Sequence, residues 1–169
     1  MELYTYKLHL KYCTNEQIKR NDIDFSGHDW WTGGAMSFKS RHISISINRS
    51  ADEVYEFASN PENLPKWAAG LSGSVRNVNG DWVAESPLGA VKVKFADKNR
   101  FGILDHDVTL PSGEIFYNPM RVFPNKDGSE LIFTLYQRPG MSDRDFRNDE
   151  EQIKKDLERL KGLVEKQSA

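Results

Sequence analysis

A histidine flanked by two carboxylates, Asp105-His106-Asp107, is the first candidate for acid–base chemistry in this chain. Imidazole exchanges its proton near neutral pH, which suits it to general acid–base catalysis. In a strand, however, neighbouring side chains point to opposite faces, so His106 cannot pair with either aspartate. Leu104 and Val108 share the parity of His106. We therefore predict that His106 faces inward, either as a core residue bonded to a neighbouring strand or as a residue that binds or protonates a ligand.

Asn118, Met120 and Arg121 form a second group of candidates in the next predicted strand. Arg121 can pair with Asp105 or Asp107 across a hairpin, and an exposed ion pair of this kind contributes little stability. Alternatively, its planar guanidinium reaches into the mouth of a cavity and holds a carboxylate or enolate oxygen. Asn118 and Met120 share one parity, which predicts a mostly apolar wall.

Aromatic residues complete the candidate site. The hydroxyls of Tyr55 and Tyr136 are donors of the kind that orient ligands in apolar pockets, although a structural role is the more common one for such residues. Trp67 is expected in the core or near a cavity mouth. The candidate catalytic residues are His106 and Arg121, and the candidate ligand-binding residues are Trp67, His106, Asn118, Met120 and Tyr136.

Motifs for metal, nucleotide and covalent chemistry are not found in the sequence. There is no Gly-x-Ser-x-Gly, His-Glu-x-x-His, phosphate-binding loop or dinucleotide fingerprint. The four histidines are scattered, so we expect no metal site and no cofactor. The single cysteine, Cys13, excludes an internal disulfide.

The elements that must position these residues begin with an alternating strand. Isoleucines alternate with polar residues over 43–47, which predicts one buried and one wet face. Two short helices follow. Ser50 and Glu53 form a capping box, and Asn60-Pro61 provides a cap and a proline suited to the first helical position.

Turn residues divide the next part of the chain into six more strands. Asn79-Gly80 is a two-residue hairpin signal, and the other links are also short, so successive strands are antiparallel neighbours. With the first strand this predicts a curved seven-stranded antiparallel sheet. The six candidates are Gly73–Val78, Asp81–Ser86, Ala90–Lys98, Gly102–Leu110, Glu114–Pro124 and Glu130–Arg138.

A long amphipathic helix closes the domain. Ser142 can cap it, and Asp143 and Asp145 in its first turn suit the helix dipole. Its apolar residues lie at helical spacing and predict one buried stripe that covers the sheet. The stripe consists of Phe146, Ile153, Leu157, Leu160 and Val164.

Residues 1–40 differ from the rest, and we treat them as an N-terminal extension to a domain at 41–166. One expectation is that the extension is flexible or loosely docked. A second is that translation starts at Met36. Alternatively, it is a functional arm that lays Trp30 and Trp31 onto the body or onto a partner subunit.

Length and composition limit the class of protein. A chain of 169 residues with 38% hydrophobic and 28% charged residues is typical of one globular domain. A net charge of −2 argues against nucleic acid as the main partner. No apolar run is long enough to span a membrane, and we expect a cytoplasmic location by default. The sequence neither requires nor excludes a homodimer.

Parts of the sequence resemble the helix-grip (SRPBCC/START-like) superfamily, which includes START domains, polyketide cyclases and Bet v 1-like proteins. The segment Ile43–Phe57 resembles the opening of bacterial members, and Trp67 resembles a tryptophan that they carry in the second helix. The segments Arg138–Ser142 and Asp156–Lys161 are similar to their last strand and closing helix. The resemblance covers about residues 41–166. It implies an α+β helix-grip fold in which a sheet and the C-terminal helix enclose a cavity.

Three functions follow as expectations, because members of this superfamily bind sterols, polyketides, quinones or hormones. The first is binding of a small hydrophobic, lipid-like, aromatic or polyketide-like ligand. The second is a cofactor-free cyclase, aromatase or dehydratase, with His106 or a tyrosine transferring protons and Arg121 stabilising an oxyanion. The third is a co-chaperone-like interaction domain that uses Trp30 and Trp31. The sequence does not decide whether the protein is an enzyme.

Overall fold

The computed structural model describes residues 37–71, 75–87 and 89–166. The expectations for Cys13, for Trp30 and Trp31 and for a start at Met36 lie outside the described residues. Within them, the order of elements is the expected one: a strand, two short helices, a run of antiparallel strands and a long closing helix.

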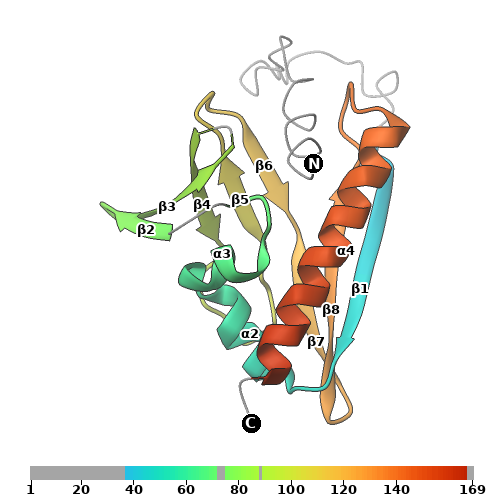
Figure 1. Cartoon of the computed structure of the whole chain (residues 1–169). Coiled ribbons are helices and arrows are strands. Elements are labelled where there is room, and N and C mark those ends of the chain that lie inside the picture. Colours follow the sequence, from blue (N-terminus) through green and yellow to red (C-terminus); the bar gives the residue numbers. More distant parts are fainter. Residues whose placement is uncertain (1–36, 72–74, 88, 167–169) are drawn as a thin grey trace, which may run out of the picture.

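Within the described residues, eight strands form two antiparallel sheets, and Figure 1 shows them curving around one side of the closing helix. The smaller sheet has the order β1-β8-β7, and the larger has the order β2-β3-β4-β5-β6. The strands are β1 (Ser40–Ile47), β2 (Val75–Val78), β3 (Asp81–Ser86), β4 (Gly89–Phe95), β5 (His106–Thr109), β6 (Ile115–Asn118), β7 (Met120–Asn125) and β8 (Gly128–Tyr136).

The α+β class is confirmed, but the predicted seven strands become eight because one of them is divided at Pro119. Proline has no backbone N–H to donate to a ladder, and it interrupts pairing in the interior of a sheet. The carbonyl of Pro119 instead accepts from the N–H of Thr134 at 2.9 Å. β6 on one side of Pro119 pairs with β5, whereas β7 on the other side pairs with β8. The break therefore sends one run of chain into two sheets.

Gly102 joins the two sheets at a point where only glycine fits. Its φ is +69°, and a Cβ on this residue would collide with the backbone carbonyl of Val122. The Val122 N–H donates to the Gly102 carbonyl at 2.9 Å. The predicted strand Gly102–Leu110 is shortened to β5, because Ile103 and Leu104 pair with Arg121 and Met120 of β7.

The two short helices begin where the sequence predicts. α2 (Ala51–Ser59) starts at the capping box formed by Ser50 and Glu53. The side chain of Asn60 accepts from the N–H of Glu62 and caps the 3-10 turn η1 (Pro61–Asn63), which leads into α3 (Leu64–Trp67). Together they form the corner between β1 and β2 that Figure 1 shows beside the lower part of the closing helix.

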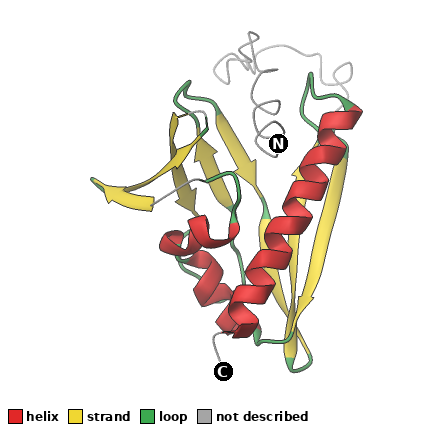
Figure 2. Cartoon of the chain, in the orientation of Figure 1, coloured by secondary structure: helices red, strands yellow, loops and turns green. Residues whose placement is uncertain are grey.

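The closing helix, α4 (Asp143–Lys166), lies along β1 and also contacts β8, α2 and α3. Figure 2 shows the helices gathered on one side of the curved sheets. The stripe predicted from the sequence is buried at Phe146, Leu157, Leu160 and Val164, and Ile153 is half-buried. The buried residues of this stripe belong to the hydrophobic core that α4 shares with the strands and the short helices. At its start, the Ser142 hydroxyl accepts from the N–H of Asp145 at 3.1 Å, as the predicted cap requires.

Candidate functional site

A cavity of about 400 Å³ lies between the larger sheet, β8, α3 and α4. Most of its lining side chains are aliphatic or aromatic, and they come from elements far apart in the sequence. Pockets of this size and character bind small apolar molecules and use a few polar groups to orient them. Examples of the apolar lining are Val91, Val93, Val108, Phe133, Ile153 and Leu157.

The opening of the cavity is marked by lining side chains that also face solvent. Ile115 and Tyr117 of β6 are 62% and 54% exposed, and Phe38, before β1, is 55% exposed. Tyr136, at the end of β8, is 36% exposed and also lines the cavity. The mouth is therefore bordered by large apolar and aromatic side chains, which a ligand meets as it enters.

His106 is the polar group on the sheet side of the cavity. It is buried, and its Nδ1 lies 3.1 Å from the backbone oxygen of Leu104. The ring contacts Phe95 at a centroid distance of 4.9 Å and Phe133 at 6.4 Å. Burial lowers the pKa of His106 below its ordinary value, against the opposing effects of the Leu104 hydrogen bond and the Asp107 charge. The imidazole is therefore neutral at pH 7.

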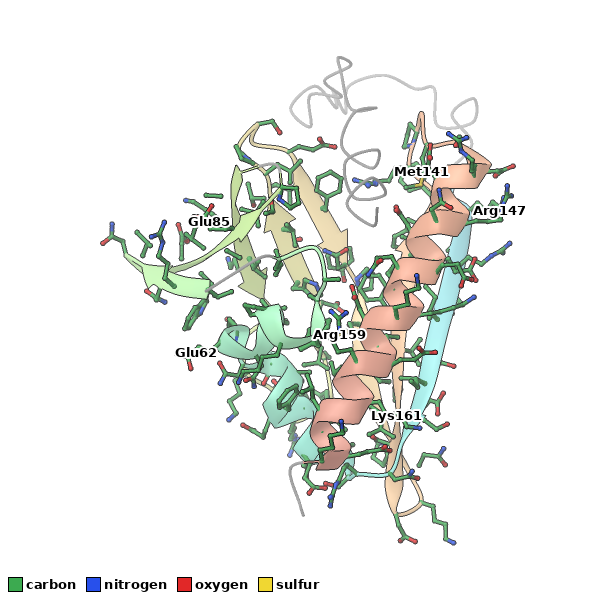
Figure 3. The ribbon with its side chains drawn as sticks, viewed as in Figure 1. Glu62, Glu85, Met141, Arg147, Arg159 and Lys161 are labelled. Atoms are coloured by element: carbon green, nitrogen blue, oxygen red, sulfur yellow. The ribbon has the colours of Figure 1, made fainter. Side chains whose placement is uncertain are left out.

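Asp156 is the polar group on the helix side. It is buried in the cavity wall, and its Oδ1 accepts from the backbone N–H of Ala69 at 3.1 Å and from Gln152 at 3.0 Å. Burial raises the pKa of this carboxyl to about 6, against these two hydrogen bonds and the positive charge of Arg159. Figure 3 labels Arg159 on the side of α4 nearer α3, and Arg147 on the side nearer β1.

Further polar residues line the cavity, among them two candidates from the sequence and two charged side chains. Asn118 of β6 and Tyr136 of β8 do so, as two of the ligand-binding candidates from the sequence. Arg138, just after β8, stacks its guanidinium 3.8 Å from the centroid of the Phe116 ring. Asp149 of α4 also lines the cavity. A guanidinium over an aromatic face is a favourable cation–π contact.

Trp67 lines the cavity and belongs to the core at the same time. Its side chain is 5% exposed, and its Nε1 is buried without a hydrogen-bond partner among the described residues. A buried donor without a partner costs about 1–3 kcal/mol. The tryptophan therefore contributes to the site through its apolar ring surface.

Arg121 lies away from the cavity, in an ion pair with Asp105. The Asp105 carboxylate also accepts from the Tyr117 hydroxyl at 2.5 Å and from the backbone N–H of Met120 at 2.9 Å. Of the two alternatives for Arg121, the structure shows the pair with Asp105. This group joins the start of β5 to β6 and β7, and it is part of the architecture around the cavity.

Met120 and Tyr55 likewise lie outside the cavity lining. Met120 is fully buried in the core, because the break at Pro119 turns β7 into the other sheet and separates it from Asn118. The Tyr55 hydroxyl accepts from the backbone N–H of Asn99 at 2.8 Å and holds the loop after β4.

Sequence reasoning did not single out the polar residues of α4. Asp149, Gln152 and Asp156 lie three or four positions apart, which places them on one face of a helix. Ile153 and Leu157 of the buried stripe lie at the same spacing and therefore on the same face. Polar residues within an apolar helical stripe were the available signal.

Among the described residues, no group of three or more histidine, cysteine, aspartate or glutamate side chains converges in a way that could hold a metal ion. None of the described helices combines the length and apolar character needed to cross a bilayer.

No protein-family model and no curated protein sequence matches this chain. Solved structures do. An uncharacterised protein of Bacillus thuringiensis superposes with a TM-score of 0.59 at 14% identity, over 75% of this chain and 98% of the other. Ara h 8.0201 gives 0.58 at 13% identity, over 76% and 98%. DynU16, a protein in the dynemicin biosynthetic locus, gives 0.57 at 14% identity, over 75% of this chain and 47% of DynU16.

Together with the strand order and the closing helix, these likenesses define the architecture as the helix-grip fold of Bet v 1-like proteins. Identities this low show the shared fold alone. The fold expected from the resemblance in the sequence is therefore confirmed, and the activity has to be argued from the cavity itself.

Proposed function

We propose that this protein binds a small hydrophobic molecule in the cavity between the larger sheet, β8 and α4. The observation that carries the proposal is a cavity of about 400 Å³ whose lining is mainly aliphatic and aromatic. Bet v 1-type proteins, whose fold this chain shares, typically bind hydrophobic ligands. Apolar surface removed from water contributes about 25 cal/mol per Å², so a bicyclic or larger apolar guest gains substantially from this site.

The polar groups of the cavity are held in fixed orientations. A binding site uses a few fixed polar groups of this kind to orient an apolar guest. Among the described residues, His106 bonds to the Leu104 carbonyl, and Asp156 bonds to the Ala69 N–H and to Gln152. These partners fix the orientation of both side chains, as is useful in a binding site.

A cavity-filling substitution with a matched control tests the proposal. Val108 lines the cavity and is half-buried, opposite Val93 in the ladder. Val83 is also a half-buried strand valine, but it lies opposite exposed Lys92 and outside the lining. Val108→Phe should weaken binding of the neutral fluorescent dye N-phenyl-1-naphthylamine by about tenfold or more, because the new ring occupies the space of the guest. Val83→Phe should change binding less than about twofold.

Thermal unfolding of both variants establishes that each is folded before the comparison is made. Absence of dye binding by the unmodified protein, or equal dye binding by Val108→Phe and the unmodified protein, would contradict the proposed function.

A further inference from the structure

The hydrogen bond between His106 and Leu104 determines which nitrogen of the imidazole carries the proton. Nδ1 lies 3.1 Å from the Leu104 backbone oxygen, and a carbonyl oxygen only accepts hydrogen bonds. Nδ1 must therefore be the protonated nitrogen. In a neutral ring the other nitrogen, Nε2, then carries a lone pair and no hydrogen. Nε2 is consequently a hydrogen-bond acceptor.

Nε2 receives no hydrogen bond from the described residues. It is not among the buried atoms that lack a partner, so it keeps some exposure, and the side chain that carries it lines the cavity. His106 itself lines the cavity, and contacts with Phe95 and Phe133 hold the ring in place. The sheet side of the cavity thus presents a fixed acceptor to whatever occupies it.

The helix side presents a second acceptor and an unfavourable environment for anions. Oδ1 of Asp156 accepts both hydrogen bonds found for this carboxylate among the described residues, which leaves Oδ2 as a further acceptor. Among the described residues of the lining three are charged: Asp149 and Asp156, which are acidic, and Arg138, which is basic. Carboxylates therefore outnumber guanidinium groups in the lining, and like charges repel a carboxylate guest.

We propose that the cavity selects an uncharged apolar molecule with a hydroxyl group, a phenol or an alicyclic alcohol, whose O–H donates to Nε2 of His106. The inference rests on the proposed function of the cavity and adds the chemical class of the guest. A hydroxyl supplies the donor that the acceptors need, and its apolar ring fills the rest of the space. A carboxylate of the same shape has no proton to donate at pH 7 and carries the disfavoured charge.

Three probes of nearly the same shape test this selection: 2-naphthol, 2-methylnaphthalene and 2-naphthoate. Their affinities are measured at pH 7 by displacement of N-phenyl-1-naphthylamine. We expect 2-naphthol to bind about tenfold more tightly than 2-methylnaphthalene, as one buried hydrogen bond allows. We expect 2-naphthoate to bind most weakly of the three. Equal binding of 2-naphthol and 2-methylnaphthalene would overturn the inference, as would the tightest binding by 2-naphthoate.

A histidine substitution locates the acceptor. In His106→Leu the affinity for 2-naphthol should fall about tenfold, to the level of 2-methylnaphthalene, whose own affinity should stay within about twofold. The matched control is His42→Leu, because His42 is exposed on β1, bonds to the Thr134 hydroxyl and lies outside the cavity lining. The control should bind all three probes as the unmodified protein does. An unchanged preference for 2-naphthol in His106→Leu would overturn the role of His106.

A measurement on the unmodified protein covers the case in which His106→Leu does not fold. Nitrogen-15 NMR should show a neutral His106 with the proton on Nδ1, and the Nε2 resonance should shift with 2-naphthol but not with 2-methylnaphthalene. A proton on Nε2, or no response to 2-naphthol, would overturn the inference. If the dye and 2-methylnaphthalene bind while 2-naphthol gains nothing, the choice of guest fails and the proposed function stands. If no probe and no dye binds, both fail.

Discussion

The Oδ1 atom of Asp156 accepts a hydrogen bond from the backbone N–H of Ala69 at 3.1 Å, across 87 positions of sequence. This bond ties the middle of α4 to the corner that follows α3, at the wall of the cavity. It also satisfies a backbone donor that would otherwise lack a partner in this corner. The carboxylate that accepts this bond is buried, and burial raises its pKa to about 6.

Asp156→Asn should remove a pH dependence of stability. The folded chain holds the Asp156 proton more tightly than the unfolded chain, because the pKa rises from 3.8 to about 6 on folding. The free energy of unfolding therefore falls as pH rises through this interval, by about 3 kcal/mol, and this group adds no further change above it. The asparagine side chain in this variant keeps an oxygen for the Ala69 N–H and does not titrate.

Urea unfolding at pH 4, 5, 6 and 7 measures this effect as the difference between the two proteins. The other carboxylates titrate alike in both, so they cancel in the difference. Asp156→Asn should gain stability relative to the unmodified protein as pH rises from 4 to 6, and the gain should then level off. A constant difference across all four pH values would contradict the account of the Asp156 pKa.

Leu157→Asp should unfold the domain or open α4. Leu157 is 1% exposed, in the buried stripe and at the cavity wall, so the substitution places an unpaired charge among apolar side chains. We expect a loss of about 4 kcal/mol or more, against less than about 1 kcal/mol for Lys155→Asp on the exposed face of the same helix. Thermal unfolding followed by circular dichroism measures both. Equal melting temperatures would show that the stripe is not buried.

Asp105→Ala should destabilise the junction of the two sheets. The substitution removes the acceptor for the Tyr117 hydroxyl and for the Met120 N–H, and it leaves Arg121 without its ion-pair partner. We expect the free energy of unfolding to fall by about 3 kcal/mol. Asp107→Ala, one position into β5, should cost less than about 1 kcal/mol. Similar losses in the two variants, measured by urea unfolding, would contradict the special role of Asp105.

Arg121→Met separates the two alternatives that the sequence left for this arginine. Because Arg121 lies in the ion pair with Asp105 and outside the cavity lining, the affinity for 2-naphthoate should stay within about twofold. A modest loss of stability should accompany the substitution, since Asp105 loses a partner. Dye displacement provides the affinity. A tenfold loss in 2-naphthoate binding would instead show that the guanidinium reaches an anionic guest.

Local signals in the sequence predicted much of the fold. Ser50 and Glu53 bond as the capping box requires, and Asn79-Gly80 turns with φ values of +54° and +94°. Such features depend on residues only a few positions apart. The parity that directed His106 inward was also informative, because β5 is a regular strand from that residue onward.

The rest of the site depends on tertiary contacts that local patterns do not contain. Pro119 divides a strand that alternation alone presents as continuous, and this places Met120 in the core and leaves Asn118 at the cavity. Aspartate is usually found on the exposed face of a helix, so the sequence gives no reason to place Asp156 at a cavity. Its partner Ala69 lies 87 positions away. Its place at the cavity follows from how α3 and α4 pack together.

Native mass spectrometry tests the central claim most directly. The protein is purified from its own host and recorded before and after addition of 2-naphthol, beside Val108→Phe treated in the same way. The account predicts one apolar molecule per chain, either carried from the host or acquired as 2-naphthol, with much less on Val108→Phe. A chain that carries nothing and takes up no 2-naphthol, or equal occupancy in Val108→Phe, would contradict a ligand-binding cavity.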